Sequence, residues 1–275
     1  MASRRRLINR IPGRAAMVLL GLLPFALALM AYLIASDLRL SANPNDKLLP
    51  SLASMGESLK RVALEPERRS GEIILWVDTL ASLRRLGIGV GLSALGALLV
   101  GIGIGVIPYL RALGAPLVGA LAMIPPMAVL PILFIAFGLG ELSKVVLIVF
   151  GITPFMIRDL ALRAGELPRE QLVKAQTLGA STGQLILRVA LPQLLPRLMD
   201  AVRLSLGAAW LFLIAAEAIA ATEGLGYRIF LVRRYLAMEV IIPYVIWITL
   251  LAVLIDLLLR GVSRWWFPWA RGATA

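Results

Sequence analysis

Several continuous apolar stretches of about 20 residues constrain this chain more than any other feature, because a helix needs about that length to cross a bilayer. The composition agrees: 60% of the residues are hydrophobic and 16% are charged, whereas soluble domains carry about 25% charge. The mean hydropathy is +0.87. The sequence therefore predicts an all-α polytopic membrane protein and argues against a soluble protein with a large core.

We expect six membrane-spanning helices, which places both termini on one side of the membrane. The fourth is short and contains Lys144, so it needs tilt or snorkelling. A short turn around Arg111, Gly114 and Pro116 is expected between the second and third. The predicted spans are residues 15–35, 86–110, 117–137, 142–157, 204–221 and 240–259.

The first span follows the basic segment MASRRRLINR, as the apolar part of a signal peptide would. The apolar run is long for a signal peptide, and Ala35-Ser36-Asp37 is a poor cleavage site. We therefore expect a retained first helix rather than a cleaved one.

The distribution of basic residues predicts the orientation, because cytoplasmic loops are enriched in Lys and Arg. With the N-terminus inside, the inner segments hold 16 basic and five acidic residues, and the outer segments hold 12 basic and ten acidic residues. Both termini are therefore expected in the cytoplasm. This asymmetry accounts for most of the net charge of +12, so no nucleic-acid partner is expected.

The segment between the first two spans, residues 37–83, is polar and contains Pro44, Pro50 and Pro66. Its first half is expected to be a linker with short helical pieces. Residues 71–85 have apolar positions at helical spacing, which predicts an amphipathic helix that lies on the outer surface or enters the next span. Arg84 and Arg85 would then lie at the membrane interface. A plain connector is the alternative.

Glycine and proline mark the second and third spans. Gly87 with Gly91, and Gly101 with Gly105, are spaced for close helix packing inside a bundle or at a dimer seam. The alternative is that membrane helices simply tolerate glycine. The third span contains Pro125, Pro126 and Pro131, which suggest either a water-lined path or a kinked packing element.

Glu217 is the most informative acid, because a carboxylate inside an apolar helix is costly unless it is paired, protonated or hydrated. It is expected to act in a pathway or gate, or else to reach the outer interface near Glu223. Asp256 is expected to be structural and to pair with Arg260. The sequence contains no cysteine and no histidine, which argues against zinc and triad chemistry.

One polar, basic segment, residues 173–197, interrupts the apolar chain and must face water or a partner. Its spacing Ala175-x3-Gly179-x9-Val189-x-Leu191-Pro192 resembles the EAA loop of the permease subunits of ABC importers. A glycine at this place can break one short helix so that a second folds back, and a proline can start the next segment. The resemblance implies a cytoplasmic coupling helix-turn-helix that docks on an ATPase subunit.

The resemblance assigns eight residues to this coupling element, and two of them depart from the family pattern. Where the family often has Glu-Ala, this chain has Val173 and Lys174, so the way in which the first turn is held differs. The expected coupling residues are Val173, Lys174, Ala175, Gly179, Ala180, Ser181, Leu191 and Pro192.

Two further stretches resemble the permeases of nitrate, sulfonates, taurine and bicarbonate. These are Pro125-x2-Ala128-x2-Pro131-x5-Phe137-Gly138-x2-Glu141-x2-Lys144 and the run LGAAWLFLIAAEAIAATEGLGY at 206–227, so that the resemblance covers about residues 80–260. It implies the type I ABC importer permease fold. The pathway or gate residues expected on this basis are Met123, Pro126, Trp210 and Glu217, and the expected binding-protein contacts are Glu223, Gly224, Gly226 and Tyr227.

The resemblance also implies an assembly in the bacterial inner membrane. It would contain a second permease copy, two ATPase subunits and a periplasmic or lipid-anchored solute-binding protein. No Walker loop is present, so ATP and Mg²⁺ are expected on the ATPase subunits, with no cofactor or metal bound by this chain, which is not itself an enzyme. The expected organisation is residues 1–36 (cytoplasmic N-terminus and first span), 37–83 (periplasmic linker and amphipathic helix), 84–262 (permease core with the coupling loop at 165–197) and 263–275 (cytoplasmic tail).

The solute is expected to be a small anion such as nitrate, a sulfonate, taurine or bicarbonate. The spans are expected to hold no buried Lys or Arg to neutralise an anion, and Glu217 would favour a cation if it lined the path. A small organic or cationic nitrogen compound is therefore the second candidate. A stand-alone channel or secondary transporter, and a membrane-integrated enzyme, are less favoured alternatives.

Overall fold

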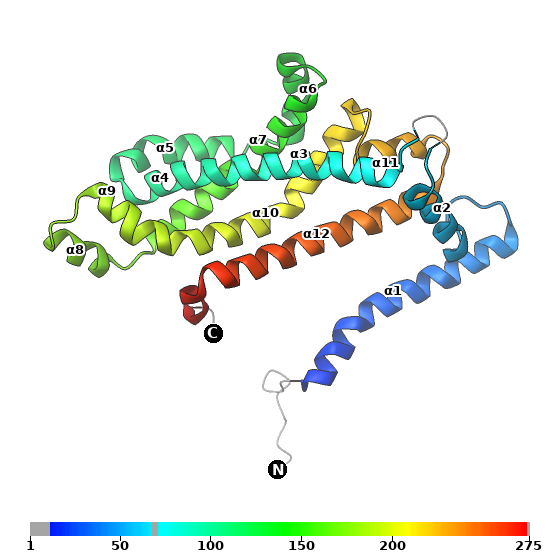
Figure 1. Cartoon of the computed structure of the whole chain (residues 1–275), viewed down its shortest axis with the longest axis horizontal. Helices are drawn as coiled ribbons and strands as arrows, with labels where there is room; N and C mark the ends of the chain where they lie inside the picture. The colour runs from blue at the N-terminus through cyan, green and yellow to red at the C-terminus, as the bar shows by residue number, and fades with distance from the viewer. Residues whose placement is uncertain (1–11, 68–70, 274–275) are drawn as a thin grey trace, which may run out of the picture.

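The structure, a computed structural model, describes residues 12–67 and 71–273, and every regular element in these ranges is helical. Figure 1 shows helices running side by side along the long axis of the molecule. The elements are α1 (Arg14–Ala42), α2 (Leu52–Leu64), α3 (Ile74–Gly96), the π-helical η2 (Ala97–Gly101), α4 (Ile102–Val106), α5 (Pro108–Leu121), α6 (Pro126–Phe137), α7 (Glu141–Gly165), α8 (Arg169–Thr177), α9 (Thr182–Gln184), the π-helical η3 (Leu185–Ala190), α10 (Leu191–Ala220), α11 (Leu225–Arg233), α12 (Met238–Trp266) and the 3-10 helix η4 (Pro268–Ala273).

Five helical runs in the described residues are long and apolar enough to cross a membrane, and α5 with α6 forms a sixth if this bent pair is one span. The predicted all-α membrane fold is therefore confirmed. Several basic residues used to predict the orientation lie outside the described residues, namely Arg4, Arg5, Arg6, Arg10, Arg68 and Arg69.

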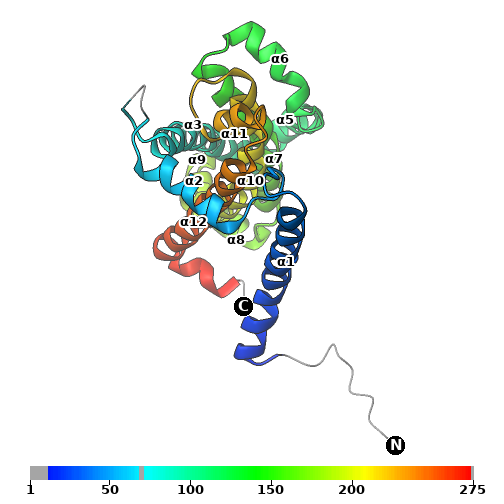
Figure 2. The same cartoon turned by 90° about the vertical axis from the view of Figure 1, so that its right-hand side faces the viewer.

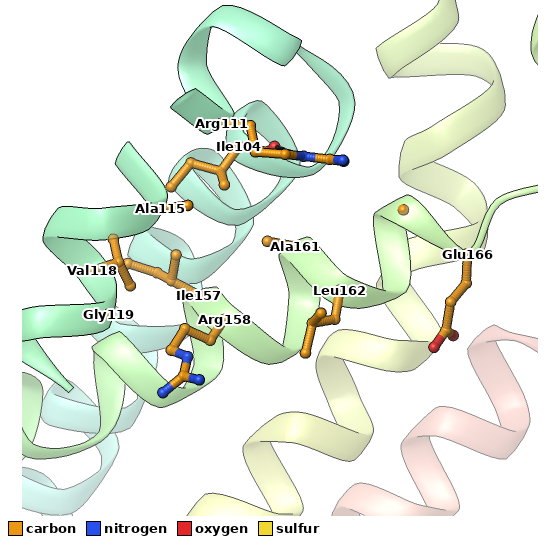
Figure 3. A pocket seen from close by; sticks show the side chains of 11 residues that line it. Ile104, Arg111, Ala115, Val118, Gly119, Ile157, Arg158, Ala161, Leu162 and Glu166 are labelled. Carbon is orange, nitrogen blue, oxygen red and sulfur yellow. Dashed lines mark hydrogen bonds between the residues drawn. The ribbon is translucent and has the colours of Figure 1, made fainter. Parts of the chain in front are cut away.

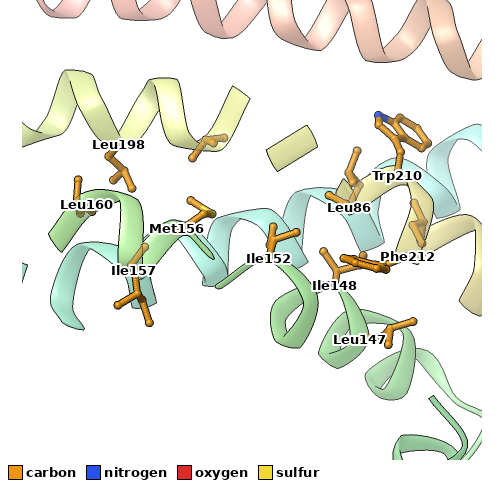
Figure 4. Packing of buried hydrophobic residues seen from close by; sticks show 14 of the residues in the cluster. Leu86, Leu147, Ile148, Ile152, Met156, Ile157, Leu160, Leu198, Trp210 and Phe212 are labelled. Atoms are coloured by element: carbon orange, nitrogen blue, oxygen red, sulfur yellow. The ribbon is translucent and has the colours of Figure 1, made fainter. Parts of the chain in front are cut away.

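The core follows α7, which packs against both α3 and α10. Ile148, Ile152, Met156 and Leu160 recur every four residues along α7 and are fully buried, so they form one continuous stripe on the helix. Figure 4 shows this stripe facing apolar side chains from α3 and α10. Gly151 lies where α7 packs against α10, since a Cβ atom there would collide with the ring of Phe212.

The second span is longer than expected and begins at Ile74 rather than residue 86, so that α3, η2 and α4 make a run of 33 residues. Of the possibilities for residues 71–85, a helix that enters the next span is therefore correct, and a separate surface helix and a plain connector are wrong. The run stops at Ile107, because the residue before a proline avoids the helical conformation. The expected turn at Arg111, Gly114 and Pro116 is wrong, since these residues lie inside α5.

The third span is broken rather than straight, with α5 and α6 bent by 93°. The break falls at Ala122–Pro125, where Pro125 has an extended conformation and Pro126 begins α6. Two adjacent prolines remove two backbone donors and disfavour a helix before them. In Figure 1, α6 (green) points away from the bundle.

The last three predicted spans also extend further than the apolar residues alone indicated. The fourth was expected to be short, but α7 has 25 residues, and charged residues such as Arg158 continue the helix past its apolar part. The fifth belongs to a helical run of 39 residues from Thr182 to Ala220, and the sixth is the 29-residue α12. Hydropathy marks the part of a helix that lies in lipid rather than its ends.

The first helix is almost free of the rest of the chain. Its apolar window has no buried residue, and Figures 1 and 2 show it approaching the other helices only near its C-terminal end. There the hydroxyl groups of Tyr32 and Ser36 donate to the carbonyl oxygens of Pro50 (2.7 Å) and Leu49 (2.9 Å). The short helix α2 follows, as expected for the first half of the linker.

Candidate functional site

The segment that resembles a coupling loop forms a helix-turn-helix at one end of the molecule. The first helix, α8, ends in a Schellman motif: the Ala180 amide donates to the Ala175 carbonyl oxygen (3.0 Å) and the Gly179 amide to that of Gln176 (2.9 Å). Gly179 has a φ of +83°, which this motif requires and which favours glycine. The Ala-x3-Gly spacing is therefore the spacing of a helix stop.

The second arm begins immediately after the turn with Ser181 as its N-cap. The Ser181 hydroxyl oxygen accepts from the Gln184 amide (3.3 Å), and the Ser181 amide donates to the Gln184 side chain (2.9 Å), which makes a capping box. The arm continues into α10 without a break. Pro192 was expected to start a new segment, but it lies inside this run, directly after the widened π-helical η3.

The predicted coupling residues differ in exposure. Val173, Lys174, Gly179 and Ser181 are exposed, whereas Ala175, Ala180, Leu191 and Pro192 are half-buried and support the turn. Sequence analysis missed Leu178, which lies at the tip and is 87% exposed. Its place in the sequence, as an apolar residue directly before the turn glycine, could have indicated an exposed side chain that contacts a partner.

The hairpin is held without the acidic residue of the family pattern. The Gln193 side-chain amide donates to the Gln171 side-chain oxygen (2.9 Å) and to the Val189 carbonyl oxygen (2.9 Å), joining α8 to the second arm. Val173 and Lys174 depart from the family pattern, and α8 is instead held through Gln171, two residues before Val173, by a hydrogen bond between neutral side chains.

A second candidate region, which we call the Glu217 cluster, lies at the other end of the molecule and comprises Asp78, Ser82, Arg85, Glu141, Lys144, Glu217 and Arg228. Its centre is Glu217, which is 0% exposed. The Glu217 carboxylate accepts from the Arg85 guanidinium (2.8 Å), the Ser82 hydroxyl (2.8 Å) and the Gly226 amide (2.9 Å). The carboxylate is therefore paired rather than open to water.

Arg85 is the residue that sequence analysis placed most wrongly. It was expected at the interface, but it is 2% exposed and bridges Glu217 to Glu141, whose carboxylate accepts from Arg85 Nε (2.5 Å). Lys144 is buried as well and pairs with Glu141 (2.7 Å). The expectation that the spans hold no buried basic residue is therefore wrong. Neighbouring residues of a helix point about 100° apart, so Arg84 faces outward while Arg85 is buried.

The same cluster caps the start of α11. The Gly224 amide donates to the Asp78 carboxylate (2.9 Å), and the Leu225 amide donates to the Ser82 hydroxyl (2.9 Å), so side chains from α3 satisfy the free donors of the helix. Arg228 Nε also donates to Asp78 (2.8 Å). Burial opposes the charge of Arg228, but Asp78 outweighs this effect and raises the pKa of the guanidinium.

The four expected binding-protein contacts separate into two pairs. Gly224 and Gly226 are buried, and Glu223 and Tyr227 are at least partly exposed. Gly224 has a φ of +125°, and a Cβ atom there would lie 2.6 Å from the Glu217 carboxylate. The glycines therefore allow the loop to close over Glu217, and only Glu223 and Tyr227 are available to another protein.

The expected pathway residues differ in exposure. Met123 is exposed at the bend between α5 and α6, and Pro126 is half-buried there. Trp210 is 4% exposed and packs in the core near Leu86 and Phe212 (Figure 4). Glu217, also in α10, is buried as well.

Two of the cavities among the described residues lie beside α7. One of about 600 Å³ lies between α4, α5 and α7, and Figure 3 shows Arg111 and Arg158 beside its apolar walls. Arg111 donates to the carbonyl oxygens of Ile104 (3.2 Å) and Gly105, which the end of α4 leaves free. The other, of about 360 Å³, lies between α7 and α10 and is lined by Gly151, Phe155, Asp159, Leu204, Ser205 and Ala208, among others.

Comparison with known proteins identifies the chain's relatives. The taurine transport system permease protein of Escherichia coli (strain K12) is 35% identical over 195 residues, 71% of each chain. The bicarbonate transport system permease protein of Synechococcus elongatus is 30% identical over 193 residues, 70% of this chain and 69% of that one. The expected taurine and bicarbonate branch is therefore confirmed.

Solved structures agree with the fold. A structure titled as an inward-facing conformation of the MetNI methionine ABC transporter superposes with a TM-score of 0.57 at 21% identity, over 69% of this chain and 94% of that chain. Residues 95–272 match the family described as binding-protein-dependent transport system inner membrane component. The chain belongs to this family, and it is a multi-pass permease subunit of an ABC importer.

Proposed function

We propose that this permease imports a small solute that carries an oxyanion group and has about the size of taurine or bicarbonate. The observation that carries this proposal is the identity of 35% and 30% to permeases named for those two solutes, over about 70% of this chain. A solute-binding protein on the outer side delivers the solute and contributes most of the selectivity.

The Glu217 cluster removes the main argument for the alternative of a cationic nitrogen compound. The argument for a cation rested on Glu217, and the 2.8 Å ion pair with Arg85 neutralises that carboxylate. Arg85 also contacts Glu141 and Glu223. The cluster therefore clamps the α10–α11 loop and leaves Glu217 paired rather than free to bind a cation.

The pathway is proposed to form between two copies of this chain. The bend at Met123 and Pro126 and the groove between α7 and α10 are the surfaces that each copy contributes. Ser205 gives the cavity there a hydroxyl group, which a hydrated solute can contact inside a membrane, and Asp159 in the same wall is paired with Arg163 (3.4 Å). On the outer side, Glu223 and Tyr227 contact the binding protein.

The hairpin is proposed to be the cytoplasmic docking element for two ATPase subunits, which bind ATP and Mg²⁺. Both termini then lie in the bacterial cytoplasm, and the segment between α1 and α3 lies outside. Val173, Lys174, Leu178 and Ser181 supply the contact surface, while Ala175 and Gly179 fix the turn. Closure of the ATPases moves the hairpin, and α10 carries the motion to the outer loop, as alternating access requires.

The solute is tested by uptake into proteoliposomes that contain the permease, its ATPase and its binding protein. We expect ATP-dependent uptake of radiolabelled taurine or bicarbonate and none of a cationic nitrogen compound such as choline. Uptake without ATPase subunits would instead indicate a channel or secondary transporter. Uptake of choline alone would contradict the anion proposal.

A further inference from the structure

A basic cavity lies between the inner ends of α10 and α12, close to the coupling hairpin. It has a volume of about 480 Å³ and is bordered by Arg203, Arg260, Arg264, Ser263 and Phe267, among others. Three of the four charged side chains that line it are arginine and one is aspartate. Neither the proposed solute pathway nor the hairpin uses this cavity.

The arginines are positioned by acidic residues but keep donors for a ligand. Arg203 donates to Asp256 (2.7 Å) and Asp200 (3.1 Å), and Arg260 donates to Asp256 (2.8 Å). A guanidinium has five N–H groups, and these contacts use three of the ten that Arg203 and Arg260 provide. The remaining donors suit an anion with several oxygen atoms, for which Arg has the best geometry.

Aromatic side chains place the cavity at the boundary between lipid and water. Trp265 is 78% exposed and Trp266 and Trp269 are 59% exposed, at the end of a membrane-spanning helix, where tryptophan is enriched at the lipid headgroups. Phe267 is buried beneath them and meets the ring of Trp269 edge to face. A soluble anion would not require this belt, whereas a lipid would contact both the belt and the arginines.

We propose that this cavity binds the phosphate headgroup of an anionic glycerophospholipid. The proposal rests on the proposed function in one respect, namely that this end of the molecule faces the cytoplasm, where anionic lipids attract basic residues close to a spanning helix. The phosphodiester oxygens accept from the remaining donors of Arg203 and Arg260, Arg264 adds positive charge to the same cavity wall, and the acyl chains lie along α12.

The site is linked to the coupling element through the C-terminal segment. The Trp269 indole nitrogen donates to the Pro192 carbonyl oxygen (3.3 Å), and Pro192 lies in the second arm of the hairpin. A bound lipid that holds η4 against α10 therefore also holds the base of that arm.

The test is lipid retention by the purified full-length permease, measured by native mass spectrometry after addition of phosphatidylglycerol or phosphatidylethanolamine. We expect preferential retention of phosphatidylglycerol. The double variant Arg260→Gln/Arg264→Gln should weaken it about 30-fold. The matched control Lys60→Gln/Arg61→Gln, which removes two exposed charges from α2, should leave it unchanged, and gel filtration shows whether each variant is folded.

Equal retention of both lipids, or equal loss in both double variants, would overturn the proposal. Retention of inorganic phosphate with no preference for phosphatidylglycerol would show a free-anion site and overturn it as well. Labelling of a Leu178→Cys variant with an impermeant maleimide tests the orientation separately. Labelling from outside would contradict the proposed function while the lipid result still stands by itself.

Discussion

At the scale of single residues, the ion pair between Arg85 and Glu217 joins α3 to α10 at the end of the permease opposite the hairpin. Its two members also satisfy backbone groups that follow α10, namely the Glu223 carbonyl oxygen and the Gly226 amide. Buried charges are tolerated only when they are paired in this way. Loss of either side chain would therefore leave the other as a buried charge without a partner.

Replacing Arg85 by Met should destabilise the protein by about 3 to 5 kcal/mol, because Glu217 would keep a buried charge without its partner. The measurement is thermal unfolding in detergent. The adjacent Arg84→Met variant is the matched control, since Arg84 is exposed, and it should be close to neutral. Equal effects of the two substitutions would contradict the assigned pairing.

Replacing Gly224 by Ala should cost about 1 to 3 kcal/mol, because φ is +125° there and the new methyl group would meet Glu217. In the complete transporter it should also reduce stimulation of the ATPase by the binding protein, since the loop would be displaced. Gly91→Ala is the control, as its Cβ atom meets nothing within 4 Å and alanine favours a helix. An unchanged melting temperature for Gly224→Ala would refute this role.

Sequence analysis was most successful for residues with a local role and least for those with a distant partner. The function of Gly179 follows from a spacing of four residues, and the left-handed conformation at that position agrees with it. Glu217 stood out because a lone acid in an apolar helix is rare. Its partner Arg85 lies 132 residues away, and a tandem Arg84-Arg85 gives no indication of which side chain is buried.

At the scale of helices, the glycine-rich face of the second span determines how closely α4 approaches α7. A Cβ atom on Gly105 would collide with that of Ala164, and one on Gly101 would lie 3.1 Å from Leu160. Small residues permit such contacts between helices in lipid. The predicted packing role is therefore confirmed for Gly101 and Gly105, whereas Gly87 and Gly91 meet nothing within 4 Å in this chain.

Gly105→Leu should separate α4 from α7 and reduce the yield of folded protein, with a loss of about 1 to 3 kcal/mol from overpacking. Gly91→Leu adds the same volume where there is space and should be tolerated. Gel filtration and thermal unfolding of the two variants provide the comparison. Comparable behaviour of both would show that the contact with Ala164 does not limit the fold.

Helix ends were harder to predict than helices. Hydropathy found the apolar centre of every span, but α7 and α10 continue through charged residues once they leave the apolar region. The bend between α5 and α6 was partly visible in Pro125 and Pro126. Its angle depends on packing against other helices, which no local pattern contains.

At the scale of the whole molecule, one helical run connects the two candidate functional regions. It begins beside Ser181 at the hairpin and reaches Glu217 in the Glu217 cluster, and its 39 residues correspond to a length of about 58 Å. A movement of the hairpin therefore acts directly on the helix that leads into the α10–α11 loop. This continuity is the structural basis of the proposed coupling.

The most direct test of this account is to ask whether the hairpin tip touches the ATPase. The chain contains no cysteine, so a single Leu178→Cys can carry a benzophenone maleimide, and Leu64→Cys in α2, also exposed, is the control. In the assembled transporter, irradiation should join Leu178→Cys, and not Leu64→Cys, to the ATPase subunit. Crosslinking from position 64, or none from position 178, would contradict the account.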